Sequence, residues 1–417
     1  MRVESGVTTA EDPWVTSAPV ASRTMWQLTN TIRHYPWGSH TVIPELLGEA
    51  TPASQPHAEL WMGAHPDAPS VLADGRTLDA AIAAEPDRLL STAVRHRFGD
   101  RLPFLMKVLA ADSALSLQAH PTTAQAEVGF AAEEAAGVAQ DDPTRTFKDP
   151  FHKPEILLAI TPVEALCGFR PVEESLHCLA KLQLPELKPT IAALARGGLQ
   201  VAIPQLLALS VKRRQSLVTA VAERAERFVA AHDPEFINTY RWAADLAKTY
   251  PGDPGVVISL LCNHLTLAPG EAVFLPAGNL HAYLSGAGVE VMASSDNVLR
   301  GGLTGKHVDL AALIEVLDFT DGRVPVIRPV LGPGGLRYPV PVEDFDLTRA
   351  ELGVDAGSLR TPGPQVLLCT EGTAVLGTDD GELVLQKGQS AFLPAGIPVS
   401  AQGPAVLYRA TTGLRAV

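Results

Sequence analysis

The 417-residue chain has few cysteines, and those it has are scattered. Their spacing does not resemble a metal knot or a disulfide framework, which would need closely paired cysteines. Free thiols among apolar neighbours are expected instead, and they fit a cytoplasmic protein in a reducing environment. The cysteines lie at four positions: Cys167, Cys178, Cys262 and Cys369.

Long hydrophobic runs and a basic surplus are also missing. No apolar run approaches the ~18 residues of a membrane-spanning helix, so no membrane partner is expected. A formal net charge of −13 disfavours a nucleic-acid partner, because phosphate backbones require a basic face. Residues 1–24 lack the basic start and apolar stretch of a secretory signal and are predicted to be a disordered leader.

The composition that is present indicates a globular protein of two or three domains, since 46% of the residues are hydrophobic and 19% are charged. Strand-like sequence predicts a discontinuous β domain over residues 25–170 and 255–320, with strands expected at 256–261 and 272–275. Apolar residues at three- and four-residue steps within 214–231 predict an amphipathic helix. Residues 171–254 are therefore predicted to be a helical insertion, broken by Pro204 and Pro234.

Two distant segments with strand-like sequences form an internal repeat. Residues 269–278 and 387–396 match at six of ten positions, 118 residues apart. Short strands with Gly-rich turns predict a mainly β fold of two jelly-roll (cupin) barrels, the second over residues 321–417. His281 corresponds to Val399 in the second copy, so the metal site is predicted only in the first barrel.

Three separate segments offer nitrogen and oxygen ligands for one metal ion. Residues 115–121 alternate, so Gln118 and His120 face the same way along a strand. Glu155 directly precedes the apolar, strand-like sequence 156–160. His281 follows a Pro-Ala-Gly turn, in a position suited to binding. Each of these residues, taken alone, could have a purely structural role in the core or in an ion pair. Together they make a mixed N/O set with room for substrate, as in open catalytic zinc sites.

Six ordered segments of the chain match one known family: Tyr-Pro-Trp-Gly at 35–38, Ala-Glu-Leu-Trp-Met-Gly-Ala-His-Pro at 58–66, Leu-Pro-Phe-Leu-Met-Lys at 102–107, Leu-Ser-Leu-Gln-Ala-His-Pro at 115–121, Lys-Asp-Pro-Phe-His-Lys-Pro-Glu at 148–155, and residues 270–304. Through them the chain resembles the zinc-dependent type I mannose-6-phosphate isomerases, a branch of the cupin superfamily. The resemblance implies one zinc per chain on the same four residues. It also implies reversible conversion of mannose 6-phosphate to fructose 6-phosphate, with a helical domain inserted into the catalytic one.

Such an isomerisation moves a proton between C2 and C1 through an enediol, which calls for proton carriers, a stabiliser of the oxyanion and a phosphate anchor. Arg300 offers a planar fork for phosphate or enediolate oxygens. Lys153 beside a dication could exchange protons, and the residue that acts on C2 is left open between several candidates. The remaining candidates are Glu290 and Asp296 as proton carriers, Asp296 with His152 for ring opening, and Ser116, Lys107 and Tyr283 for substrate binding.

Two other function classes compete with the isomerase. A cupin iron dioxygenase would have no use for the glutamine ligand or for the cations Lys153 and Arg300. A silent sugar-phosphate-binding regulator would not need the proton carriers. The isomerase is therefore the expected function. We also expect the enzyme to be a monomer that feeds mannose activation or mannose catabolism.

Overall fold

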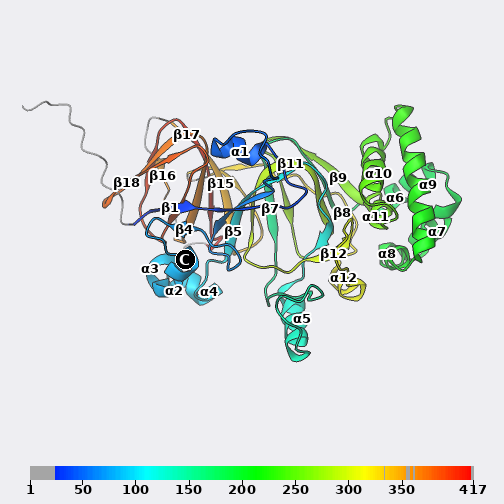
Figure 1. The fold of residues 1–417 in the computed structure, drawn as a ribbon, viewed down its shortest axis with the longest axis horizontal. Coiled ribbons are helices and arrows are strands. Elements are labelled where there is room, and N and C mark those ends of the chain that lie inside the picture. The colour runs from blue at the N-terminus through cyan, green and yellow to red at the C-terminus, as the bar shows by residue number, and fades with distance from the viewer. Residues whose placement is uncertain (1–23, 333, 354–356, 360–361, 415–417) are drawn as a thin grey trace, which may run out of the picture.

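The computed structural model describes residues 24–332, 334–353, 357–359 and 362–414. Two strand-rich regions lie side by side, and a group of helices packs at one end (Figure 1). The leader predicted for residues 1–24 lies outside the described residues except for Thr24. Within the described part, no helix combines the length and apolar character needed to cross a bilayer.

The first sheet carries most of the predicted site. It is antiparallel throughout the described residues and is centred on its longest strand. Its ten strands are β2 (Thr31–Arg33), β3 (Glu59–Gly63), β5 (Phe104–Ala111), β6 (Leu117–Ala119), β7 (Glu155–Ala159), β8 (Val163–Phe169), β9 (Cys262–Leu267), β10 (Ala272–Leu275), β11 (His281–Ala293) and β12 (Leu299–Gly302).

Strand β11 joins the two halves of this sheet. Its beginning pairs with β6 and β8, whereas its end pairs with β5 and β7. A register shift between Tyr283 and Ser285 marks the change. Gly286, at φ +99°, lies next to it, and a Cβ there would come within 2.1 Å of the carbonyl oxygen of Pro162. Glycine therefore permits the bend that places both ends of β11 around one site.

The second sheet is formed mainly by the C-terminal part of the chain. In the described residues its eleven strands are β1 (Trp26–Thr29), β4 (Val71–Leu72), β13 (Val330–Gly332), β14 (Gly335–Tyr338), β15 (Asp346–Leu352), β16 (Gly357–Ser358), β17 (Gln365–Thr378), β18 (Gly381–Gln386), β19 (Ser390–Leu393), β20 (Ser400–Gln402) and β21 (Ala405–Thr411).

The two sheets share a hydrophobic core. Met106 and Val291 of the first sheet belong to the same buried cluster as Leu368 and Phe392 of the second. Strand β1 pairs with β19, with Trp26 opposite Phe392. Residues 25–170 therefore contribute strands to both sheets, which the sequence text did not predict. The mainly β class with a helical segment is confirmed, and the two closed barrels remain a prediction.

The internal repeat has the same local structure in both copies. Strands β10 and β19 occupy equivalent positions in the two segments. The preceding glycines, Gly270 and Gly388, have φ of +89° and +84°, and the following ones, Gly278 and Gly396, have +78° and +75°. The repeat therefore specifies a turn, a strand and a second turn. Val399 is buried in the core of the second sheet.

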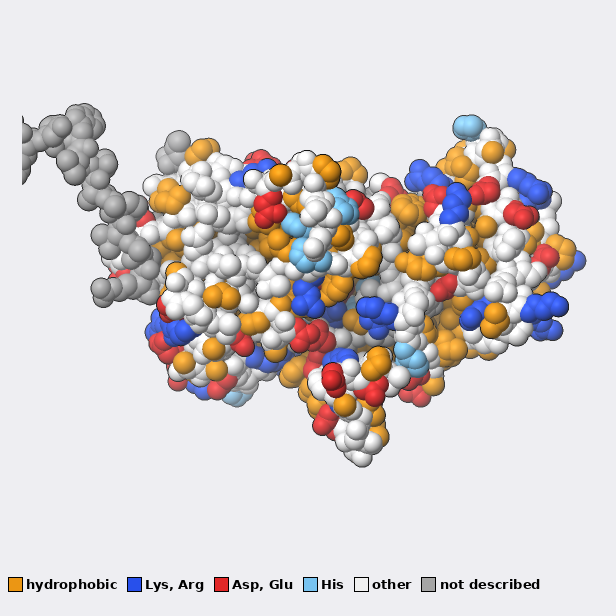
Figure 2. Space-filling view, in the orientation of Figure 1, with side chains coloured by type: hydrophobic (Ala, Val, Ile, Leu, Met, Phe, Trp, Pro, Cys, Tyr) orange, Lys and Arg blue, Asp and Glu red, His pale blue; other side chains and the backbone are white. Residues whose placement is uncertain are grey.

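The helical segment follows β8. The predicted helix at 214–231 is confirmed, beginning slightly earlier than expected. Acidic and basic side chains are interspersed over this end of the molecule (Figure 2). Its elements are α6 (Val172–Lys181), the 3₁₀ turn Pro185–Leu187, α7 (Lys188–Gly197), α8 (Leu199–Leu207), α9 (Val211–Ala230), α10 (Ile237–Thr249) and α11 (Gly255–Ser259).

Two predictions in this region were wrong. The strand expected at 256–261 is the short helix α11, because this apolar run is buried by neighbouring helices rather than by strand partners. A short apolar run does not distinguish a buried strand from a buried helix. Pro204 lies inside α8 and does not break it. The remaining helices are α1 (Val42–Leu47), α2 (Leu78–Ala84), α3 (Pro86–Leu90), α4 (Thr92–Phe98), α5 (Thr123–Ala135) and α12 (Leu310–Val316).

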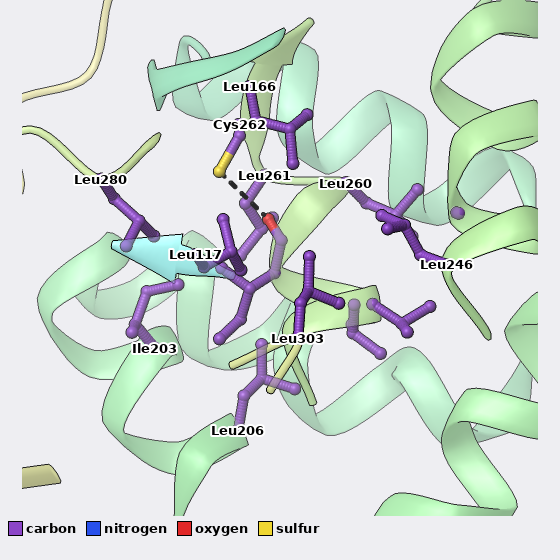
Figure 3. Packing of buried hydrophobic residues seen from close by; sticks show 14 of the residues in the cluster. Leu117, Leu166, Ile203, Leu206, Leu246, Leu260, Leu261, Cys262, Leu280 and Leu303 are labelled. Carbon is purple, nitrogen blue, oxygen red and sulfur yellow. Dashed lines mark hydrogen bonds between the residues drawn. The ribbon is translucent and has the colours of Figure 1, made fainter. Parts of the chain in front are cut away.

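The helical segment packs against the strands that carry two of the predicted ligands. Leu117 of β6 and Leu280, next to β11, share a buried cluster with Ile203 and Leu206 of α8 (Figure 3). Since Gln118 and His281 follow these two leucines directly, apolar packing fixes the backbone from which both side chains extend.

Candidate active site

The predicted ligands His120, Glu155 and His281 meet at one buried point. Their ligand atoms all lie within 4.8 Å of one another. Nε2 of His120 lies 3.4 Å from Oε1 of Glu155, and Nε2 of His281 lies 3.5 Å from Oε2. His120 comes at the end of β6, whereas Glu155 and His281 begin β7 and β11. His281 is thus the first residue of a strand rather than a loop residue.

Backbone carbonyls fix the orientation of both imidazoles. Nδ1 of His120 lies 2.6 Å from the carbonyl oxygen of Asn297, and Nδ1 of His281 lies 3.0 Å from that of Asn279. A carbonyl only accepts hydrogen bonds, so Nδ1 carries the proton and Nε2 presents a lone pair. Nε2 of His120 is buried and has no hydrogen-bond partner among the residues that the structure describes. A buried lone pair beside a carboxylate suits a metal ion, and this hydrogen-bonding arrangement is typical of metal-binding histidines.

Gln118 lies in the same row of residues. It pairs with His281 on one side and with Arg300 on the other. Its amide nitrogen donates to Oγ of Ser116 at 3.2 Å, which leaves the amide oxygen as the atom able to bind a metal. The predicted alternation is confirmed, since Leu117 and Ala119 are buried on the other face.

Burial and charge set the protonation of this cluster. Burial lowers the pKa of His120 to about 4, so its imidazole is neutral near neutral pH. Burial acts in the opposite sense on Glu155, but the neighbouring imidazole of His120 and the charge of Lys153 hold the pKa of Glu155 well below its ordinary value. A neutral imidazole and an ionised carboxylate are the forms that bind metals.

A second polar group lies on the strands beside the ligands. Nζ of Lys107 lies 3.2 Å from Oε2 of Glu290 and 3.5 Å from Oε1 of Glu59. The hydroxyl of Tyr283 donates to Oε1 of Glu290 at 3.0 Å. Burial raises the pKa of Glu290, and the charges of Glu155 and Glu59 act in the same direction against that of Lys107. Burial alone would lower the pKa of Lys107, but the carboxylates of Glu59 and Glu290 outweigh it and raise this pKa.

Lys153 and Asp296 complete the charged surroundings of the ligand cluster. Nζ of Lys153 lies 3.4 Å from Oε1 of Glu155. Burial opposes ionisation of Asp296, yet a hydrogen bond from His65 and the charges of His65, Lys153 and Lys107 lower the pKa of this carboxyl. The predicted proton carriers therefore influence one another electrostatically around one point.

The structure gives Asp296 and His152, predicted to act together in ring opening, different side-chain neighbours. Nε2 of His152 lies 3.1 Å from both carboxylate oxygens of Asp344, in the C-terminal part of the chain. Asp296 instead faces His65, with Oδ1 3.4 Å from Nε2. The two sheets share a buried core, and this packing brings Asp344 of the C-terminal part next to His152.

Arg300 is half-buried. In the described part of the chain, no carboxylate lies within the 4.0 Å of an ion pair, and its guanidinium donates no hydrogen bond to a protein group. Burial lowers the pKa of Arg300, and no neighbouring carboxylate counters it. Arg300 lines a small cavity of about 20 Å³ together with Thr144, His307 and Asp309. A guanidinium without an internal partner is available to a ligand.

Sequence reasoning missed two positioning residues. Asn297 is fully buried, and its side chain accepts from the backbone nitrogen of Lys148 at 2.7 Å and donates to the carbonyl oxygen of Phe151 at 2.8 Å. It thereby clamps the segment before Glu155 beside its own carbonyl, which orients His120. Asn297 follows Asp296 directly, so it lies within the segment 270–304 that carries the family resemblance. That position was the sequence signal that could have identified it. His65 was quoted within a motif but given no role.

A second group of possible ligands lies next to the first. His65, Asp67 and Asp296 have ligand atoms within 4.8 Å of one another, but Asp67 is exposed. Among the described residues, neither group includes a residue of the second sheet.

Comparisons with known proteins agree with this geometry. The catalytic domain of type I phosphomannose isomerases matches residues 25–172. The mannose-6-phosphate isomerase of Salmonella typhimurium is 39% identical over 396 residues, covering 92% of this chain and 99% of that protein. The human enzyme is 32% identical over 418 residues, covering 91% and 96%.

Solved structures show the same likeness. The Salmonella typhimurium enzyme bound to fructose 6-phosphate and zinc superposes with a TM-score of 0.84 at 37% identity, covering 94% of this chain and 100% of that one. A zinc-bound mannose 6-phosphate isomerase structure gives 0.83 at 37% identity with the same coverage.

Proposed function

Because this chain belongs to the type I mannose-6-phosphate isomerases, we propose that Gln118, His120, Glu155 and His281 hold one zinc ion per chain. We propose further that the enzyme interconverts mannose 6-phosphate and fructose 6-phosphate reversibly through an enediol. The observation that carries the proposal is the buried Nε2 of His120, which lies 3.4 Å from Glu155 and accepts no hydrogen bond from any described residue.

The donor set supports zinc. Two imidazole nitrogens and one carboxylate are typical of catalytic zinc, with the amide oxygen of Gln118 as the fourth ligand. An iron dioxygenase could use two histidines and one carboxylate, but it would leave Lys153, beside Glu155, without a role. When bound, zinc would polarise the carbonyl and hydroxyl oxygens of the sugar.

The chain's own side chains would carry the protons. Isomerisation removes a proton from C2 and returns one to C1, which needs groups that exchange protons near neutral pH. Glu290, whose pKa is raised by burial, and Lys153 are candidates for this transfer. Asp296 with His65 takes the place first assigned to Asp296 with His152, as the pair proposed to open the ring.

The phosphate is assigned to the side of Arg300. Lys107 is engaged by Glu59 and Glu290, and two carboxylates beside it would repel a phosphate. Lys107 and Tyr283 are therefore proposed to position Glu290. Ser116 accepts a hydrogen bond from Gln118, which leaves its own hydroxyl hydrogen for a phosphate oxygen. The guanidinium of Arg300 would provide the charge-assisted contacts.

The cellular setting is part of the same proposal. A monomeric, cytoplasmic enzyme would feed mannose activation or mannose catabolism. All four cysteines are buried free thiols, which supports a reducing compartment.

The proposal is tested with zinc-loaded protein and mannose 6-phosphate in deuterated water. We expect about one zinc per chain, loss of turnover on chelation, and fructose 6-phosphate that carries some solvent deuterium at C1. Partial labelling is expected because a shielded base returns part of the original hydrogen before it exchanges. Tight binding without product by a folded, zinc-loaded sample would favour the silent regulator. Product without any label would contradict the exchanging enediol route and leave the isomerase assignment intact.

A further inference from the structure

A cavity of about 280 Å³ lies between the edge of the first sheet and the helical segment. It is formed where β8 and β9 meet α6 and the beginning of α10, which lie next to one another in Figure 1. This volume exceeds that of a few water molecules and suits a small metabolite. Its lining residues are distinct from those of the proposed substrate site, and the ones that matter here are Arg170, Glu174, Asn238, Thr239, His264 and Arg323.

Arg170 is a buried cation that forms no ion pair within the described part of the chain. It is 5% exposed, and its Nη1 is buried without a hydrogen-bond partner. Its Nη2 donates to Oγ1 of Thr239 at 3.0 Å, and its guanidinium lies 5.1 Å from the ring centre of Phe236. Across the described ranges, no carboxylate lies within the 4.0 Å that defines an ion pair with Arg170. An unpaired buried charge is costly, so this arrangement favours an external anion.

The beginning of α10 adds a second positive feature at the same place. Thr239 lies in the first turn of this 13-residue helix, which has no side-chain hydrogen bond at its N-cap residue Phe236. The first N–H groups of a helix have no intrahelical acceptors and carry partial positive charge. A guanidinium at this end of a helix is electrostatically unfavourable unless an anion lies between or beside the two.

The nearby acidic side chains lie beside groups other than Arg170. Glu174 pairs with Arg323 at the rim. Glu164 pairs with His264 at 2.7 Å, and Glu235 pairs with Lys181 at 2.7 Å. Among the described residues, the guanidinium of Arg170 therefore lines the cavity beside the start of α10 with no carboxylate at ion-pair distance.

We propose that this cavity binds a small phosphate-type oxyanion, either inorganic phosphate or a phosphate monoester. A planar guanidinium fork and the free N–H groups of a helix are two structures that recognise such anions. The site is separate from the metal cluster but is joined to it by the backbone. Arg170 follows directly on β8, in which Cys167 pairs with His281.

The experiment measures hydrogen–deuterium exchange of the zinc-loaded full chain with millimolar inorganic phosphate, against chloride of equal ionic strength. A ligand at ten times its Kd slows exchange that requires its release by about tenfold. We expect saturable protection of this size in peptides covering 234–242. Peptides covering 296–304 report binding at the substrate site separately.

Two variants and a matched control keep the proposal falsifiable. Asn238→Asp places a fixed carboxylate in the first turn of α10 at an exposed position, and it should abolish the phosphate-dependent protection. Gln200→Glu makes the same amide-to-carboxylate change in the first turn of α8, also exposed, and should leave the protection intact. Arg170→Gln should abolish it as well, and Asn238→Asp decides the matter if that buried variant does not fold.

Absence of protection at 234–242 in the wild type, or protection that survives Asn238→Asp, would overturn the proposal. A glycerol phosphate arm identifies the source of the anion. Stronger protection than by inorganic phosphate indicates a site for phosphate monoesters, and equal protection indicates recognition of the phosphoryl group alone. Either result supports an oxyanion site.

Discussion

Arg300 lies directly opposite Gln118 where strand β12 pairs with β6. Because Gln118 in turn lies opposite His281, one row across three strands holds two proposed metal ligands and the cation proposed to bind substrate. Neighbouring strands lie about 5 Å apart, so the backbone itself sets the spacing between metal and anion sites.

Replacing His281 by alanine should remove zinc and turnover together, because His281 is a proposed ligand. The matched change in the second copy of the repeat, Val399→Ala, should leave zinc content and turnover near wild type. It should lower the free energy of unfolding by about 2 kcal/mol, since Val399 is buried. Elemental analysis, steady-state rates and urea unfolding check both variants, and a metal-loaded, active His281→Ala would refute the ligand assignment.

Arg300→Ala should retain stoichiometric zinc and lose rate by a factor on the order of 10² to 10³, the usual effect of removing a donor to developing charge. Arg213→Ala, at an exposed position on α9, serves as the control and should change the rate little. A near-native rate for Arg300→Ala would show that the unpaired guanidinium has no part in turnover.

Glu290→Gln keeps the size of the side chain and removes its charge. If Glu290 carries a proton, the rate should fall by about 10² to 10⁴ while zinc is retained. Tyr283→Phe removes only the hydrogen bond to Glu290, worth about 1 kcal/mol, and should cost about fivefold. Equal losses in the two variants, with unchanged pH–rate profiles, would indicate that Glu290 only positions its neighbours.

Asn297→Ala should weaken zinc binding by about 10- to 100-fold, as is typical when the groups that orient a ligand are lost. The variant loses the clamp on the segment 148–151 that holds its own carbonyl under His120. Gln215→Ala, an exposed amide on α9, is the control. Zinc competition with a chelator measures the effect, and unchanged affinity would contradict the positioning role.

The metal-free protein should lose stability in acid through His120. Its folded pKa of about 4 lies below the ordinary 6.5, so the unfolded chain takes up the proton first as pH falls. The contribution is complete above about pH 6.5 and is lost toward pH 4, amounting to about 3 kcal/mol. Urea unfolding of chelated wild type and His120→Gln between pH 7 and 4 should give a shallower slope for the variant. Identical slopes would disprove this role of His120.

Much of the site could be read from the sequence because its ligands lie in short segments with local geometry. Alternation along a strand places Gln118 and His120 on one face, and the turn–strand–turn repeat has matching glycine conformations in β10 and β19. Helix α9 followed from its apolar spacing. Each of these features depends on neighbours a few residues away, which the sequence specifies directly.

Only the tertiary structure decided which distant groups meet. It paired Asp296 with His65 and His152 with Asp344, placed β1 in the C-terminal sheet, and turned residues 255–259 into a helix. It also placed Arg170 against the first turn of α10, with no carboxylate of the described residues close enough to form an ion pair. Such contacts arise because packed sheets and helices bury surfaces far apart in the chain, and the burial that sets partners and pKa values exists only after folding.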